Sequence, residues 1–336
     1  MLKKIFAILL LSVFVAGISA GCAQQAPAPA AQGGGAVGET NWPTRPVTVI
    51  VPFNPGGDTD FYARLYATFL EDILGQTITV INVDGAGGTV GATQASVAAN
   101  DGYTVLFYHT GNMFVNVLLG TTELDHNDFA ISNIAVLDDT NVLVASPDAG
   151  FADAEDFLAR ARANPGAYNA ATTISGFSFF TLRLMELAGD FRVNPVDVGG
   201  AAAMIPSVLG GHTELAKNSF GVFRQHIESG DMVPLMFVGH ERNPNFPDVP
   251  TATEMGLEGA IASRAYFFAF PLGTDPAILH RLSDAVYEVQ QLPEFAPAIR
   301  DAFAVEPFFL GTPYVQQFMD DMWADMSQYQ EYLLAQ

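Results

Sequence analysis

The chain has 336 residues, of which 49% are hydrophobic and only 15% are charged, and this balance predicts a substantial buried core. Acidic residues outnumber basic ones so strongly that the formal net charge is −22 at pH 7. Because such a surface repels phosphate groups, we exclude nucleic acid and anionic lipid headgroups as partners.

The N-terminus has the pattern of a lipoprotein export signal, which we assign to residues 1–21. Lys3 and Lys4 precede an apolar run that ends at Val15, and small residues continue to Cys22. A retained membrane helix would need a longer apolar stretch. Cys22 is the only cysteine, which excludes an intrachain disulfide, thiol catalysis and a cysteine-based metal cluster. We predict that Cys22 is lipidated and anchors an extracytoplasmic protein, in the periplasm or on the outer cell surface.

Residues 22–41 are rich in Ala, Pro, Gly and Gln and cannot bury enough apolar surface to fold. We therefore predict a flexible tether, with folded structure from Trp42 onward. The remaining chain is long enough for one large domain or two medium ones.

From Thr44 onward, strands and helices alternate and glycine turns separate them, which indicates a mostly parallel α/β sheet. A helix capped by Asp58 or Thr59 is predicted to end at Gly75, and a small-residue helix at Ala99. The predicted strands are Thr44–Phe53, Thr77–Val83, Tyr103–Tyr108, Asn141–Ala145, Tyr168–Ile174, Val196–Val198, Glu214–Ser219 and Met232–Val238. The further predicted helices are Ala152–Ala163, Phe179–Ala188, Ala202–Leu209, Phe220–Ser229, Pro276–Gln291 and Pro313–Leu334.

Three strand-to-helix junctions place small residues where a helix begins. The first N–H groups of a helix lack partners and carry partial positive charge, which suits a carboxylate or phosphate. Ligands of parallel sheets bind at this edge, so we predict a site shared by both halves of the chain, although any single junction is also compatible with a simple tight turn. The candidate residues at these junctions are Phe53, Asn54, Pro55, Gly56, Gly57, Asp58, Thr59, Asp60, Ser175, Gly176, Phe177, Ser178, Gly199 and Gly200.

Two further residues lie near predicted strand ends. Gly87 belongs to a glycine-rich segment whose spacing is wrong for a dinucleotide-binding loop, because Val90 replaces the third glycine. We interpret this segment as a close-packed turn, with contact to the ligand as the alternative. His109 follows a strand end and is a candidate for the edge of a pocket, with a structural role as the alternative.

Enzyme motifs are absent from the sequence. It contains no G-x-S-x-G elbow, no H-E-x-x-H pair and no Walker-type loop, and the histidines lack metal-binding spacing. We therefore predict no catalysis, no cofactor and no metal. Arg183 and Arg264 are candidates to pair with a carboxylate, but we favour internal ion pairs for both in so acidic a chain. The aromatic groups around Phe177 and Phe267 are assigned to the core, with Phe177 also at a junction.

Several segments together resemble one family, the substrate-binding receptors of the tripartite tricarboxylate transporters, also called Bug proteins. The resemblance extends from about Trp42 to the C-terminus and is most specific where a P-F-x-P-G-G-x-x-D segment is followed by a G-A-G-G segment. The segments that carry it are WPTRPVTVIVPFNPGGDTDFYARLYA (Trp42–Ala67), LGQTITVINVDGAGGTVGA (Leu74–Ala92), NDGYTVLF (Asn100–Phe107), DVGGAAAMIPSVLGGHTELA (Asp197–Ala216) and PDVPTATEMGL (Pro247–Leu257).

The resemblance implies a two-lobed periplasmic-binding-protein fold of the type II, Venus-flytrap kind, with a mostly parallel sheet flanked by helices in each lobe. Lobe one would comprise residues 42–143 and 264–336, and lobe two residues 144–263. The family function implied is capture of a small organic carboxylate for membrane permease subunits. The Phe53–Asp60 loop would hold the carboxylate, the lobe-two junctions would close over it, and Asn218 and Ser219 would face the cleft.

The chain departs from the family pattern at two positions. Asp58 stands where the family loop usually has a small neutral residue, which favours a ligand of lower charge, a ligand with an amino group, or a bound cation. Phe177 is bulky at a junction usually built from small polar residues, which favours an apolar or aromatic carboxylate. Two other functions remain open, namely a ligand sensor that signals to a membrane protein and an extracytoplasmic hydrolase.

Overall fold

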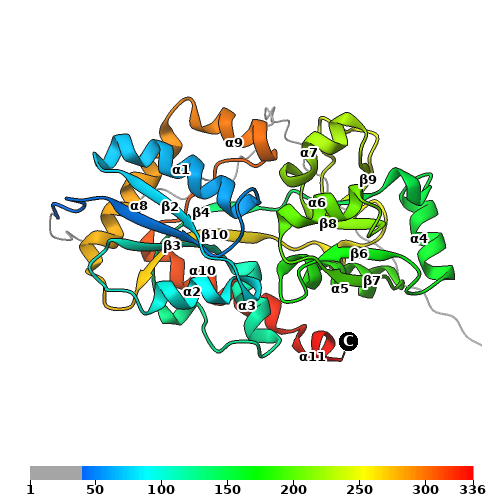
Figure 1. Cartoon of the computed structure of the whole chain (residues 1–336), viewed down its shortest axis with the longest axis horizontal. Helices are drawn as coiled ribbons and strands as arrows, with labels where there is room; N and C mark the ends of the chain where they lie inside the picture. Colours follow the sequence, from blue (N-terminus) through cyan, green and yellow to red (C-terminus); the bar gives the residue numbers. More distant parts are fainter. Residues whose placement is uncertain (1–39, 336) are drawn as a thin grey trace, which may run out of the picture. The chain divides into compact units, whose positions relative to one another are not determined.

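The computed structural model describes residues 40–335, and its strands form two five-stranded sheets flanked by helices (Figure 1). The predicted signal peptide, Cys22 and most of the tether lie outside the described residues. Within the described range, no helix combines the length and the apolar character needed to cross a bilayer.

The first sheet has the strand order β2-β1-β3-β10-β4. β1 pairs in parallel with β2 and β3, whereas β10 pairs antiparallel with β3 and β4. The strands are β1 (Val47–Val51), β2 (Ile78–Asn82), β3 (Thr104–His109), β4 (Phe129–Asp138) and β10 (Arg264–Pro271).

The second sheet repeats this plan with the order β7-β6-β8-β5-β9. β6 pairs in parallel with β7 and β8, and β5 is the antiparallel strand. The prediction of two mostly parallel sheets is therefore confirmed, with one antiparallel strand in the fourth position of each. The strands are β5 (Asn141–Ala145), β6 (Asn169–Thr172), β7 (Asn194–Asp197), β8 (Leu215–Ser219) and β9 (Val233–Phe237).

The chain crosses between the sheets twice, and the antiparallel strand of each sheet is the one that follows a crossing. β4 ends at Asp138 in the first sheet, and β5 begins at Asn141 in the second. β10 returns to the first sheet at Arg264, which lies opposite Asp138 in the strand register. The two crossings therefore bring Asp138 and Arg264 together at the end of the first sheet.

Helices cover both faces of the first sheet, and the side chains of β10 show how. Tyr266, Phe268 and Phe270 alternate along β10 and pack into one cluster with α1, α8 and α9. The residues between them pack on the opposite face with α2, α3 and α10. These helices are α1 (Asp58–Leu74), α2 (Thr89–Ser96), α3 (Thr110–Leu118), α8 (Pro276–Gln291), α9 (Phe295–Phe303) and α10 (Thr312–Ser327).

The second sheet is also covered on both faces. Val142 and Val144 of β5 pack with α6 and α7, whereas Leu143 and Ala145 pack with α4 and α5. This alternation follows from the two-residue period of a strand. The helices are α4 (Ala154–Ala163), α5 (Phe177–Gly189), α6 (Ala201–Leu209) and α7 (Phe220–Ser229). A last short helix, α11 (Gln330–Leu334), follows α10.

Several sequence predictions of local structure were incomplete or wrong. The helices α3 and α9 and the strands β4 and β10 were not predicted. β4 and β10 are almost entirely buried, so they lack the alternation of a half-exposed strand, whereas the buried residues of α9 (Phe295, Ile299 and Phe303) do have helical spacing. The predicted helix Pro313–Leu334 is broken between Ser327 and Gln330. Asp58 and Thr59 do not cap α1, because the N-cap is Gly57 and both residues lie inside the helix.

Candidate functional site

A cavity of about 310 Å³ lies where strands of both sheets end and helices begin. The first sheet contributes the β1–α1 loop, the β3–α3 junction and the start of β10, and the second sheet contributes the β6–α5 and β7–α6 junctions and the end of β8. The cavity is lined by Phe53, Asn54, Gly57, Asp58, Thr59, His109, Asn112, Thr173, Ser178, Gly200, Ala201, Ala202, Ala203, Asn218 and Arg264.

The structure brings about half of the candidate residues together on this cavity. Those on the lining are Phe53, Asn54, Gly57, Asp58, Thr59, His109, Ser178, Gly200 and Asn218. Those absent from the lining are Pro55, Gly56, Asp60, Gly87, Ser175, Gly176, Phe177 and Gly199.

Sequence reasoning missed six lining residues. Ala201, Ala202 and Ala203 form the first helical turn after Gly200, so extending that junction by one turn would have found them. Asn112 lies on the unpredicted helix α3, and Thr173 directly follows β6. Arg264 was assigned to an internal ion pair and also lines the cavity. Within the described chain, no group of three or more His, Cys, Asp or Glu side chains is placed to hold a metal ion.

The N-terminus of α1 is occupied by the chain's own carboxylates. The Gly56 N–H donates to Asp60 Oδ2 at 3.1 Å, and the Thr59 N–H donates to Asp58 Oδ1 at 2.6 Å. Burial raises the pKa of Asp60, but hydrogen bonds from Arg64 and Asn82 outweigh it and lower the pKa. Two backbone donors of the Phe53–Asp60 loop are therefore used within the loop itself.

The N-terminus of α6, by contrast, has no acidic residue in its first turn. Its N-cap, Gly200, has an extended backbone and makes no side-chain cap. The Ala203 N–H donates to Gly200 O at 3.0 Å, whereas the N–H groups of Ala201 and Ala202 have no acceptor among the described residues. Since both residues line the cavity, these two donors are available to an anion there.

Uncharged hydroxyl groups lie beside this open helix end. Ser178 Oγ lies 2.9 Å from Thr172 Oγ1 and accepts a hydrogen bond from the Thr173 N–H at 3.1 Å. Thr173 Oγ1 donates to Gly199 O at 2.6 Å, which ties the two lobe-two junctions together. This side of the cavity is thus polar, fixed in position and without a charged side chain.

His109 presents a neutral donor to the cavity. It is the N-cap of α3, and its Nδ1 accepts the Asn112 N–H at 3.2 Å. Burial, and then the positive charge of Arg264, hold its pKa well below the usual value. Because Nδ1 is an acceptor and the ring is neutral, the proton resides on Nε2. The ring stacks on Phe53 with centroids 5.3 Å apart.

Asn112 and Gly87 join the two sheets beside the cavity. Asn112 Oδ1 accepts the Phe177 N–H at 2.8 Å, and Asn112 Nδ2 donates to Gly87 O at 3.0 Å. A Cβ atom on Gly87 would overlap Ser175 Oγ and approach Ser175 O to 3.1 Å. Gly87 therefore forms a close-packed turn, and Phe177, which is 1% exposed, packs in the core behind the cavity wall.

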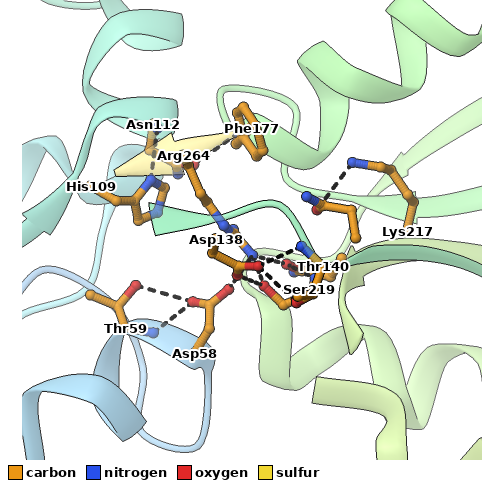
Figure 2. A network of polar contacts seen from close by, with 12 residues as sticks. Asp58, Thr59, His109, Asn112, Asp138, Thr140, Phe177, Lys217, Ser219 and Arg264 are labelled. Carbon is orange, nitrogen blue, oxygen red and sulfur yellow. Dashed lines mark hydrogen bonds and ion pairs between the residues drawn. The ribbon is translucent and has the colours of Figure 1, made fainter. Parts of the chain in front are cut away.

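Arg264 is the centre of a buried polar network (Figure 2). Its Nη2 lies 2.7 Å from Asp58 Oδ2 and 3.5 Å from Asp138 Oδ2, and donates to Asn218 Oδ1 at 2.8 Å and to Ser219 Oγ. Burial lowers the pKa of Arg264, but the carboxylates of Asp58 and Asp138 outweigh it and raise the pKa. The predicted internal ion pairing is confirmed for Arg264, and for Arg183, which pairs with Glu186.

Lys217 lies behind the same wall and has no carboxylate partner within the described chain. Its Nζ donates to Asn141 Oδ1 at 3.2 Å and to Thr181 Oγ1, and lies 5.5 Å from the centre of the Phe177 ring. Burial, followed by the positive charge of Arg264, holds the pKa of Lys217 well below its usual value. Lys217 is therefore easier to deprotonate than an exposed lysine.

Comparison with known proteins identifies the family. The model described as "Tripartite tricarboxylate transporter family receptor" matches residues 62–330. The chain is also 30% identical to the protein BugT of Bordetella pertussis over 276 residues, which cover 80% of this chain and 82% of BugT. The chain belongs to the tripartite tricarboxylate transporter receptor family.

Solved structures confirm the two-lobed periplasmic-binding-protein fold of this receptor. The periplasmic binding protein BugD superposes with a TM-score of 0.81 at 24% identity, covering 87% of this chain and 98% of BugD. MatC from Rhodopseudomonas palustris, solved with bound malate, superposes with a TM-score of 0.78 at 24% identity, covering 86% of this chain and all of MatC (100%).

Proposed function

We propose that this receptor binds a small organic carboxylate in the cavity between its two sheets and delivers it to the permease subunits of a tripartite tricarboxylate-type transporter. The observation that carries the proposal is the open N-terminus of α6, where the N–H groups of Ala201 and Ala202 reach the cavity beside uncharged hydroxyl groups. Malate bound to MatC, a protein with the same fold, is consistent with this ligand class.

Both lobes contribute to the cavity, which supports a mechanism of ligand-dependent closure. Gly57 and Ala201 belong to opposite lobes, and a Cβ on Gly57 would lie only 3.5 Å from the Ala201 Cβ. A ligand that contacts both loops stabilises the closed form by the contacts absent from the open form. The permease would recognise that form. Lipidation of Cys22 would keep the receptor, exported from the cytoplasm, at the membrane surface.

The geometry also supports binding without catalysis. Ser178 is the serine on the cavity lining and would be the candidate nucleophile. Its Oγ is hydrogen-bonded to the Thr172 hydroxyl and to the Thr173 N–H. His109 carries its ring proton on Nε2 and uses Nδ1 as a helix cap, so it has no lone pair to offer as a general base. We therefore infer a receptor that returns its ligand unchanged.

Calorimetric titration with mono-, di- and tricarboxylates tests the proposal, and mass spectrometry of molecules released from freshly purified protein identifies the ligand. Ala201→Pro is the sharpest variant, because proline at the first helical position removes one N–H donor yet fits the extended Gly200 before it. We expect ligand binding to weaken about 10-fold or more, because the variant loses one charge-assisted hydrogen bond to the ligand. Absence of binding by every acid would contradict the proposal.

A further inference from the structure

The two helix ends that face each other across the cavity differ in charge. The first turn of α6 contains no acidic residue, and the N–H groups of Ala201 and Ala202 have no acceptor in the described chain. The first turn of α1 contains Asp58 and Asp60, and the Thr59 N–H is bonded to Asp58. An anion is therefore favoured on the α6 side. On the α1 side, the carboxylate of Asp58 makes the cavity unfavourable for a second anionic group.

The charged side chains of the lining strengthen this asymmetry. Asp58 and Arg264 are the only two charged residues on the lining, and they are paired with each other. Arg264 also lies 3.5 Å from Asp138, whose carboxylate accepts the N–H and hydroxyl of Thr140. Two carboxylates thus share one guanidinium, and these three side chains together carry a formal charge of −1, with Lys217 as a further basic group behind the wall.

Asp58 is a buried carboxylate on the lining. Its residue exposure is 4%, Oδ2 faces Arg264 and the Tyr266 hydroxyl, and Oδ1 accepts the Thr59 N–H. A buried carboxylate oxygen stabilises a neighbouring positive charge strongly, because water does not screen it. A cationic group on the ligand would offset the surplus charge.

From these observations, and provided that the proposed carboxylate receptor function is correct, we infer that the ligand is a zwitterionic amino-carboxylate with an uncharged side chain. Its carboxylate binds at the N-terminus of α6, and its ammonium group lies toward Asp58. The flat wall made by the stacked rings of Phe53 and His109 suits an apolar side chain. The cavity of about 310 Å³ is at the small end for ligand pockets.

Matched pairs of ligands that differ only in the amino group test this inference at neutral pH. We would titrate the wild-type protein with leucine against 4-methylpentanoate, and with alanine against propionate, alongside succinate and citrate. The amino member of a pair should bind about 10-fold more tightly or better. Equal or tighter binding of the des-amino member would overturn the ligand class yet leave the carboxylate receptor intact. Failure of every compound would overturn both.

The variant Asp58→Asn then tests the residue. It preserves the shape of the side chain and an acceptor for the Thr59 N–H, so we expect the preference for the amino member to shrink to about threefold or less. Asp60→Asn is the control, because it makes the same charge change in the same helical turn away from the lining. An Asp58→Asn protein that keeps the wild-type preference would overturn the assignment. So would des-amino acids that bind only when a divalent cation is added.

Discussion

The guanidinium Nη2 of Arg264 lies 2.7 Å from the Oδ2 of Asp58, and this ion pair joins the first residue of β10 to the first residue of α1. The same nitrogen donates to Asn218 at the end of β8 in the other sheet. One buried cation therefore links the return crossing of the chain, the wall of the cavity and the second lobe.

We predict that Arg264→Met destabilises the protein by about 3–5 kcal/mol, because Asp58 and Asp138 would remain buried without their cation. Urea unfolding measures the effect. Arg300→Ala is the control, since Arg300 and Glu306 form an exposed ion pair and its loss should hardly move the unfolding midpoint. Similar midpoints for the two variants would show that the Arg264 cluster adds no stability.

Much of the fold could be predicted from the sequence, because its signals are local. The period-four apolar residues of α1 and the left-handed Gly75 at its end are local features, and the predicted α7 (Phe220–Ser229) matches the structure residue for residue. β10 could not be predicted in this way. Its eight residues are all buried, so the alternation that identifies a half-exposed strand is missing.

The site was only partly predictable for a different reason. Glycine junctions indicate where a helix begins, and Gly57 and Gly200 indeed lie on the cavity. Which donors remain free depends on tertiary contacts, however. Nothing local in the sequence shows that Asp58 pairs with Arg264, more than 200 positions further along the chain, or that Asn112 reaches Phe177 in the other lobe.

Lys217 gives a pH-dependent prediction. It is the only lysine after Lys4, and its pKa in the folded protein lies well below the usual 10.5. Below about pH 10.5 the unfolded chain binds a proton at Lys217 that the folded chain does not, so the free energy of unfolding decreases as the pH falls toward the folded-state pKa.

Lys217→Met removes this linkage. Relative to the variant, the wild type should lose up to about 1.4 kcal/mol of stability per pH unit as the pH falls below about 10.5, until the folded-state pKa is reached. Chemical denaturation of both proteins across this range measures the difference. Stability curves that stay parallel would mean that Lys217 remains protonated in the folded state.

Gly87 tests whether the close contact between the lobes is needed for binding. Gly87→Ala would place a Cβ against Ser175 of the opposite lobe, within 3.1 Å of its carbonyl oxygen. Gly120→Ala is the matched control, because Gly120 has a similar left-handed φ of 69°, against 62° for Gly87, yet a Cβ there meets nothing within 4 Å. Both variants should lose about 1 kcal/mol of stability from backbone strain alone.

Only Gly87→Ala should also weaken ligand binding, by about 10-fold, because a clash between the lobes acts on the closed form. Equal affinities in calorimetric titration of the two variants would show that ligand binding does not require this contact.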